Sequence, residues 1–414
     1  MKKLLSILAL SFFSMASLAE TDTQKVIKQY SDIAHAVFED ALIAAEKLDA
    51  EIDNFLQAPT AEGLEKTRNA WKAARAPYLQ SEVFRFGNPV VDDWEGELNA
   101  WPLDEGLIDY VSAGYNHEMG NIGATANIIA NRTLTIGGDS IDLTEITPEL
   151  LSDLNELGGS EANVATGYHA IEFLLWGQDL NGTDAGAGNR PYTDFVTGEQ
   201  CTHGNCDRRI AYLKSATRLL IENLQYMTEQ WQENKPDNYR HQLFSEDENT
   251  VLTKILFGMG SLSLGELAGE RMKVALEANS PEDEQDCFSD NTHNAHFYDA
   301  KGIRNVYEGN YRRINGELIQ GFSIDDLIQA KNPGLHQKLS MAFENTEQKL
   351  QVMVDSAESG EMAFDQMIAE GNEKGYKIIS DAITALVDQT RLIEQLAQNI
   401  GIEKLEPDAA DHSF

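Results

Sequence analysis

The residues of this chain best suited to chemistry are His169 and Glu172, which stand three positions apart in the run GYHAIEFLLW. A helix formed by residues 160–176 would be apolar on nearly all sides, so the pattern predicts a buried helix. Side chains three positions apart on a helix are neighbours. Because a buried carboxylate must be matched by a cation, a proton or a metal ion, the pair predicts either a structural hydrogen bond or part of a metal site.

Gly167 is a second unusual feature of this predicted helix. A glycine inside a helix costs about 1 kcal/mol relative to alanine. We therefore expect Gly167 to allow close packing, or access for a ligand, near His169.

The first 19 residues have the pattern of a secretion signal. Lys2 and Lys3 give a positive start, residues 4–15 form a short apolar run, and Ser17 and Ala19 are small residues before a cleavage point. The run is too short to span a bilayer, and no later stretch approaches about 18 uninterrupted apolar residues. We expect an exported protein of the periplasm or cell envelope, with peripheral contact to a membrane as a further option and no transmembrane segment in the mature chain.

Export places the three cysteines in an oxidising compartment. Cys201 and Cys206 are separated by four residues that include Gly204, so the chain can turn and bring their sulfur atoms together. This spacing predicts a loop disulfide. Cys287 is then left over, and we expect it to be a small buried apolar side chain.

The charge of the chain argues against one class of partner. Its 414 residues include 68 acidic and 32 basic side chains, which gives a net charge of -36. Such a chain repels phosphate backbones and attracts cations, so we expect no nucleic-acid partner.

Hydrophobic periodicity predicts an all-α protein. The predicted helices cover residues 26–55, 60–86, 160–176, 207–233, 248–278, 335–357 and 365–400, with a further helix starting at Thr147–Pro148. One short hairpin is predicted within 132–143. Three segments have the pattern of long irregular loops, at 87–123, 177–206 and 279–315. His293 and His296 fall in the last of these loops, where metal binding and simple hydrogen bonding are both open.

The order of helices and acidic loops in residues 24–176 is similar to the order in 207–353. This weak repeat predicts two pseudo-repeated helical bundles packed together, with a cleft at or near their junction. We therefore divide the chain into a signal peptide (1–19), an N-terminal bundle (20–200), a C-terminal bundle (201–402) and a tail (403–414).

The run GYHAIEFLLWGQD resembles the GxHxxE signature of the imelysin family, which includes bacterial envelope proteins known as iron-regulated proteins and others labelled insulin-cleaving metalloproteases. The likeness continues through these runs: FRFGNP (84–89), NAWPLDE (99–105), NGTDAGAGNRPYTDF (181–195), GNCDRR (204–209), CFSDNTH (287–293) and GIRNVYEG (302–309). These companions make the assignment specific. The resemblance implies an all-helical fold of two related bundles, a location in the cell envelope and expression linked to iron.

The resemblance also implies a site. His169 and Glu172 match the signature, and by position Glu82 and Asp104 match the acids that complete the metal cluster in relatives. One imidazole and three carboxylates suit iron, with zinc or copper as alternatives. Arg85, one turn from Glu82, could instead neutralise a carboxylate. The implied partner is a metal ion or an iron-containing ligand, together with envelope iron-transport components.

A peptidase is the alternative function. Zinc peptidases of the HExxH type need two histidines four positions apart, and the one His-Glu pair here, His117-Glu118, is followed by MGN. Glu172 could still act as a base beside a metal-bound water. We favour a binding protein over an enzyme; a helical interaction protein with a structural His/Glu pair is the third option.

Overall fold

The computed structural model describes residues 20–115, 121, 123–136 and 139–414. The predicted signal peptide (1–19) lies outside the described residues. The fold is all-α, as the sequence predicts. Its main helices are α1 (Asp22–Gln57), α2 (Ala61–Leu79), α3 (Pro89–Asn99), α4 (Pro148–Leu154), α5 (Gly167–Trp176), α6 (Cys206–Trp231), α7 (Tyr239–Leu243), α8 (Glu248–Ser261), α9 (Ala275–Ala278), α10 (Thr292–Glu308), α11 (Ile324–Lys331), α12 (Pro333–Glu358), α13 (Phe364–Ile368) and α14 (Glu373–Ile400).

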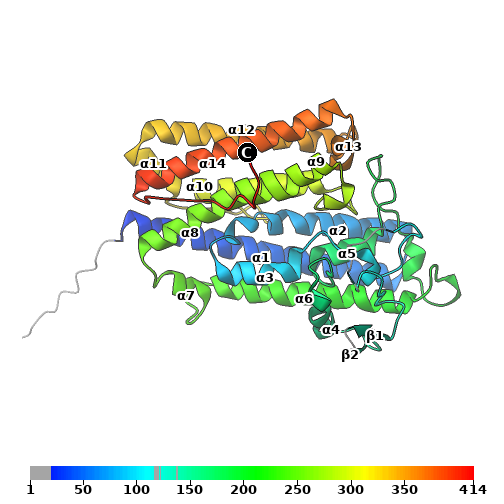
Figure 1. Cartoon of the computed structure of the whole chain (residues 1–414). Helices are drawn as coiled ribbons and strands as arrows, with labels where there is room; N and C mark the ends of the chain where they lie inside the picture. The colour runs from blue at the N-terminus through cyan, green and yellow to red at the C-terminus, as the bar shows by residue number, and fades with distance from the viewer. Residues whose placement is uncertain (1–19, 116–120, 122, 137–138) are drawn as a thin grey trace, which may run out of the picture.

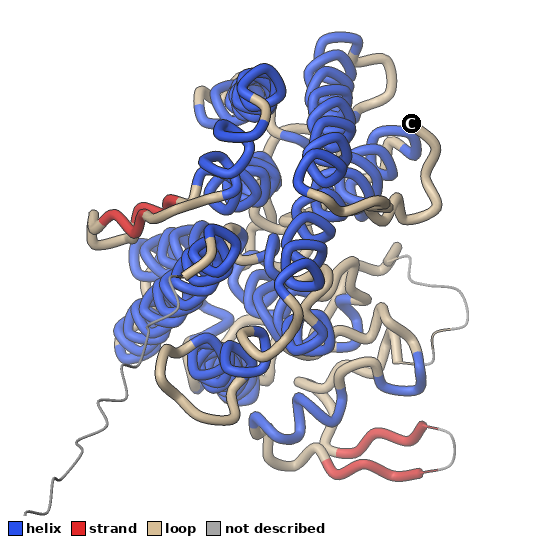
Figure 2. Tube along the Cα trace, turned by 90° about the vertical axis from the view of Figure 1, so that its left-hand side faces the viewer, coloured by secondary structure: helices blue, strands red, loops and turns tan. Residues whose placement is uncertain are grey.

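Shorter elements connect these helices. They include the 3-10 turns η1 (Glu82–Phe84) and η7 (Pro281–Asp283) and the π-helical segment η6 (Leu262–Val274), which joins α8 to α9. Two antiparallel ribbons pair β1 (Thr133–Ile136) with β2 (Asp139–Asp142) and β3 (Asn310–Arg312) with β4 (Leu318–Gln320). Figure 2 shows the ribbons on opposite sides of the helical body. The first ribbon confirms the hairpin predicted within 132–143.

The helices form two groups, one above the other in Figure 1. Helices α1, α2, α3, α5 and α6 pack together below, and α10, α11, α12 and α14 pack together above. The run from α8 through η6 joins the groups, because α8 lies against α1 while η6 packs on α14. Buried apolar side chains of both groups form one continuous core.

Local signals explain where the first long helix lies. Thr21 caps α1 through a capping box with Gln24, and Pro59 follows its last turn. Val37, Ala41 and the residues that follow at steps of three and four are buried against α2 and α6. This long buried stripe positions α2 and, beyond it, the site helix α5.

Two segments predicted as irregular contain helices, so those predictions were wrong in part. Segment 87–123 contains α3, and segment 279–315 contains α10. The many polar residues of α10 suggested a loop, but several of them are buried with partners on other elements. Asp299 pairs with Arg271, and the Asn305 amide donates to Gln80. Tertiary pairing therefore overrides the local polar pattern.

The internal repeat and the domain boundary stay predictions. Helix α6 packs against α1 and α5, so a boundary at residue 200 separates α6 from the helices that it contacts.

The helix from Glu248 to Ala278 is long and apolar enough to cross a membrane by composition alone. In the structure, 72% of its most apolar window is buried within the protein. This burial is typical of a core helix of the protein.

Candidate metal centre

Helix α5 starts where Gly167 meets α3. The predicted helix was to begin near Ser160, but it begins at Gly167, whose φ of +77° lies in the left-handed region that glycine adopts without strain. A Cβ at this position would lie 2.3 Å from the carbonyl oxygen of Leu98. Gly167 is thus the first residue of the helix rather than an interior one, and it permits the close packing that places His169 beside α3.

His169 and Glu172 face each other on α5. The Nδ1 atom of His169 lies 3.0 Å from Oε2 of Glu172, and both side chains are buried, at 1% and 0% exposure. The other carboxylate oxygen of Glu172 accepts a hydrogen bond from the backbone N–H of Ser289 at 3.0 Å. The pair therefore lies where the first group of helices meets the loop before α10.

Asp286 from this loop completes a group of three ligand-bearing side chains. Its Oδ1 atom lies 4.0 Å from Nδ1 of His169. One ligand atom each from His169, Glu172 and Asp286 lies within 4.8 Å of the other two, and all three residues are buried. One imidazole and two carboxylates thus converge from α5 and the loop.

Arg75 of α2 supplies a positive charge at the side of this group. It donates to Asp286 Oδ1 at 2.7 Å and to Asn99 Oδ1 at 2.6 Å. Burial alone would raise the pKa of Asp286, but the Arg75 guanidinium outweighs it and holds that pKa below its usual value. The group has two carboxylates and one guanidinium, and Arg75 pairs with Asp286. Among the described residues, Glu172 therefore has no arginine or lysine partner.

Asn99 determines which ring nitrogen of His169 carries the proton. Its Oδ1 accepts from Arg75 and lies 3.2 Å from His169 Nε2, so Nε2 must be the N–H that donates to it. Burial first, and then the charge of Arg75, lowers the pKa of His169 to about 3, so the ring is neutral. The Nδ1 lone pair then faces Glu172.

Two acceptors that face each other need a proton or a cation between them. Burial, and then the charge of Asp286, raises the pKa of Glu172 well above its usual value. A proton on Glu172 satisfies the contact with His169 in one state. A metal ion bound by the same atoms would satisfy it in another, and a donor set of one nitrogen and several carboxylate oxygens suits iron or zinc.

Glu82 lies in a different cluster. Its carboxylate accepts from Arg271 at 2.9 Å, and the same guanidinium pairs with Glu266 and Asp299. Arg85 pairs with Asp92, Glu95 and Glu266, so it does not neutralise Glu172.

Asp104 also lies apart from the three ligand-bearing side chains. Its carboxylate accepts hydrogen bonds from the Tyr115 hydroxyl and the Asn121 amide. Among the described residues, the structure thus brings together His169, Glu172 and Asp286, and does not add Glu82 or Asp104 to that group.

Sequence reasoning missed Asp286, Asn99 and Arg75. Two of them could have been noticed from their place in the sequence, next to the runs that resemble the family. Asn99 is the first residue of NAWPLDE, and Asp286 directly precedes CFSDNTH. Arg75 is completely buried on the inner face of α2. The sequence indicated only that Arg75 lies on a predicted amphipathic helix, and not that its side chain is buried.

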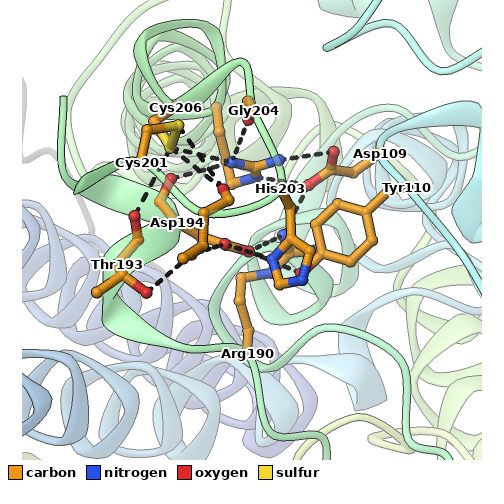
Figure 3. The surroundings of a disulfide bond; sticks show 11 residues. Asp109, Tyr110, Arg190, Thr193, Asp194, Cys201, His203, Gly204 and Cys206 are labelled. Carbon is orange, nitrogen blue, oxygen red and sulfur yellow. Dashed lines mark hydrogen bonds and ion pairs between the residues drawn. A yellow bond between two sulfur atoms is a disulfide. The ribbon is translucent and has the colours of Figure 1, made fainter. Parts of the chain in front are cut away.

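The cysteine loop belongs to another polar cluster, which includes Asp194 and Arg190. Cys201 and Cys206 are joined in a disulfide, and Cys287 is free. Figure 3 shows Asp194 beside the disulfide, with dashed contacts from its carboxylate to both His203 and Arg190. His203 Nδ1 lies 2.7 Å from Asp194, and Arg190 pairs with the same carboxylate at 3.1 Å.

His293 and His296 lie on α10 instead of a loop. His293 Nε2 lies 3.1 Å from Glu358, and the His296 ring packs edge-on against Phe364. Neither belongs to a group of three ligand-bearing side chains in the described part of the chain.

Comparison with known proteins gives a consistent result. The sequence model of the Imelysin family matches residues 34–393. Over 345 residues the chain is 24% identical to iron-regulated protein A of Synechococcus elongatus, and the match covers 81% of this chain and 75% of that relative.

Two crystal structures are similar to the whole fold. One is of an iron-regulated protein A precursor from Parabacteroides distasonis, with a TM-score of 0.65, 16% identity, and coverage of 93% of this chain and 97% of the other. The second is of an imelysin-like protein from Psychrobacter arcticum, with a TM-score of 0.59, 16% identity, and coverage of 96% and 99%.

Proposed function

The chain belongs to the imelysin family, and on that premise we propose that it binds a metal ion, with iron favoured, in iron uptake or homeostasis in the bacterial cell envelope. His169, Glu172 and Asp286 are the proposed ligands. The signal-like residues 1–19 support export to the periplasm.

One observation carries this proposal: three ligand atoms converge within 4.8 Å in a completely buried place that holds more carboxylates than cations. Desolvated carboxylates are costly without a partner. A metal ion would replace the proton on Glu172 and use the Nδ1 lone pair that Asn99 leaves free. Asn99 would then orient the ligating histidine, as hydrogen-bonded neighbours do in metal sites.

The donor set favours iron or zinc over calcium, because it includes an imidazole nitrogen. Copper is a further candidate. The description of one relative as iron-regulated supports iron among these.

Glu82 and Asp104 are proposed as ligands only on the strength of the family resemblance. Glu82 would have to leave Arg271, and Asp104 would have to leave Tyr115 and Asn121, before either could reach a shared ion. The three-residue set needs no such exchange.

Burial also favours binding over peptide cleavage. The cavity next to His169 has a volume of only about 10 Å³. A peptide bond would not fit there, so a peptidase would require a large opening of the junction. The peptidase alternative is therefore an outcome to test and not our proposal.

The test is metal analysis of protein purified from the periplasm without an affinity tag, followed by competition between iron, zinc and copper. We expect one tightly bound ion per chain. His169→Ala, Glu172→Gln and Asp286→Asn should each abolish stoichiometric binding while circular dichroism stays helical.

Matched controls separate the two ligand sets. His293→Ala removes another buried imidazole, and Glu95→Gln another buried acid; both should keep the metal. Loss of metal in Glu82→Gln or Asp104→Asn would add those residues to the site. Unchanged affinity in His169→Ala and Glu172→Gln would refute the proposal, and peptide cleavage lost only in Glu172→Gln would favour the enzyme.

A further inference from the structure

A pocket of about 410 Å³ is formed by the end of α5, the loop that follows it and residues 110–112. Its walls combine three large side chains, Tyr110, Trp176 and Leu180, with one arginine, Arg190. A pocket of this size can hold a small organic molecule. None of the three proposed metal ligands is among the residues that line it, so the pocket is separate from the metal centre.

Arg190 is almost completely buried, with 3% exposure, and one edge of its guanidinium lacks an acceptor. Its Nη1 atom donates to Asp109 at 2.7 Å and to Asp194 at 3.1 Å (Figure 3). Its Nε and Nη2 atoms have no hydrogen-bond partner within the described part of the chain. Buried N–H groups left in this way cost free energy, so this edge calls for an acceptor from a ligand.

Two other buried arginines show what the same edge binds. In Arg209, Nε and Nη2 donate together to the two carboxylate oxygens of Asp109, at 2.6 and 3.0 Å. Arg75 uses the same pair of nitrogens for Asp286, at 3.3 and 2.7 Å. The edge presents two parallel N–H groups, which match the two oxygens of one carboxylate. The free edge of Arg190 therefore fits a carboxylate.

Gly177 covers this free edge with backbone alone. A Cβ at position 177 would lie 3.6 Å from Nε and 3.8 Å from Nη2 of Arg190, so glycine leaves that space without a side chain. Gly177 and Arg190 both line the pocket. A small shift of the glycine backbone therefore opens the two N–H groups to a ligand in the pocket.

We propose that this pocket binds a small organic molecule that carries one carboxylate on an apolar body. The Nε and Nη2 atoms of Arg190 hold the carboxylate, and the apolar body packs against Trp176, Tyr110 and Leu180. The ring of Tyr110 lies 4.8 Å from the Arg190 guanidinium, so the apolar wall and the charged edge are adjacent. Leu180 is 71% exposed, and such a ligand would cover it.

The charges around Arg190 favour one carboxylate over a more highly charged anion. Arg190 and Arg209 pair with Asp109 and Asp194, so these four charges balance. His203, whose Nδ1 lies 2.7 Å from Asp194, can add one positive charge when it is protonated. The chain as a whole has a net charge of -36, which disfavours a phosphate dianion.

The experiment titrates the chain from residue 20 to residue 414 with 3-phenylpropionate and with octanoate, by isothermal calorimetry. We expect at least one of them to bind at one site per chain. The matched alcohols, 3-phenylpropan-1-ol and octan-1-ol, lack the carboxylate and should bind at least about tenfold more weakly. Arg190→Lys keeps a positive charge beside Asp109 and Asp194 but has no paired edge, so it should weaken binding of the acid by at least about tenfold.

A second variant tests the apolar wall without touching the buried cluster. Leu180→Ala changes an exposed side chain, so the fold should persist, and it should weaken binding by about threefold through lost apolar contact. Met341→Ala is the matched control, because Met341 is 62% exposed on α12 and does not line the pocket. It should bind the acid as the natural chain does.

Four results would each overturn this proposal. They are the absence of binding of either acid by the natural chain, equal binding of the acids and their alcohols, unaltered binding in both Arg190→Lys and Leu180→Ala, and binding of inorganic phosphate as tight as that of the acids. His169→Ala distinguishes the pocket from the proposed metal centre. It should abolish binding of iron or zinc and leave the titration with the acid unchanged, and loss of that titration would place the carboxylate on the metal instead.

Discussion

Two buried clusters of acids connect the two groups of helices, and they are organised differently. One surrounds Arg271, whose guanidinium lies between Glu82, Glu266 and Asp299 at 2.7 to 2.9 Å. The other contains Glu172 and Asp286, and its arginine, Arg75, contacts only one of these acids. In the first cluster the guanidinium of Arg271 lies at the centre of the acids. In the second cluster no arginine lies between His169 and Glu172, and the imidazole faces the carboxylate directly.

The comparison shows why residue types alone do not define a metal site. Glu82 is a buried acid, as Glu172 is, but each nitrogen of its arginine already donates to a carboxylate. The second cluster differs because the imidazole of His169 directly faces one of its acids, with Nδ1 3.0 Å from Glu172 Oε2. We infer that the Arg271 cluster stabilises the junction, while the His169 cluster retains capacity for an ion.

The largest effect should follow removal of Arg271. Arg271→Met leaves three carboxylates without their common cation, two of them almost completely buried, so it should lower the free energy of unfolding by roughly 3 to 5 kcal/mol. Urea denaturation at neutral pH measures this loss. Arg85→Met is the control, because Arg85 is partly exposed and should cost much less. Equal losses in the two variants would contradict the central role of Arg271.

Arg75→Met should cost somewhat less, roughly 2 to 3 kcal/mol in metal-free protein, because Glu172 can hold a proton. A bound metal ion would supply the lost positive charge, so saturating iron or zinc should restore much of the stability. The same metal should not rescue Arg271→Met. Denaturation of both variants with and without metal makes this comparison, and rescue of Arg271→Met would place the metal in the other cluster.

The sequence predicted the helices well where local signals and burial agree. Thr147 and Pro148 mark the start of α4, and the long apolar stripe marks α1. It predicted His169 and Glu172 as partners, because residues three apart on one helix must be neighbours. Asp286 could not be placed by such reasoning, since its position beside His169 depends on packing across more than a hundred residues of chain.

Helix α10 was missed for a related physical reason. Its polar residues favour a loop locally, and only their partners on other elements make a buried helix stable. Gly167 was noticed as unusual, but the close approach of Leu98 that requires it is a contact between α3 and α5. Sequence periodicity does not report such contacts.

Asn99→Ala should weaken metal binding without removing a ligand. It deletes the acceptor that holds His169 in the tautomer with Nδ1 free, and loss of such a neighbour typically reduces metal affinity about 10- to 100-fold. Competition titration with the metal found in the natural protein measures the change. Asn88→Ala removes a buried amide that binds Tyr30 and Tyr239, away from His169, and should leave the affinity unaltered. Equal weakening in both variants would mean that the effect is structural.

Each of the two regions has a neutral imidazole: His169 in one and His296, beside the Arg271 cluster, in the other. The smallest predicted effect is the contribution of His296 to the pH dependence of stability. Burial first, and then the charge of Arg271, lowers the pKa of His296 to about 3, whereas an unfolded histidine titrates near 6.5. Below about pH 6.5 the unfolded chain therefore binds a proton that the folded chain does not, so stability falls as the pH falls. Near pH 5.5 the loss from this one group is about 1.4 kcal/mol. His296→Leu should remove that part of the acid sensitivity, while the opposing titration of buried acids elsewhere stays the same in both proteins. Urea denaturation of the natural chain and of the variant, at neutral pH and at about pH 5.5, checks this. If both proteins lose the same free energy of unfolding between the two pH values, His296 binds a proton as readily in the folded protein as in the unfolded chain, and the prediction is wrong.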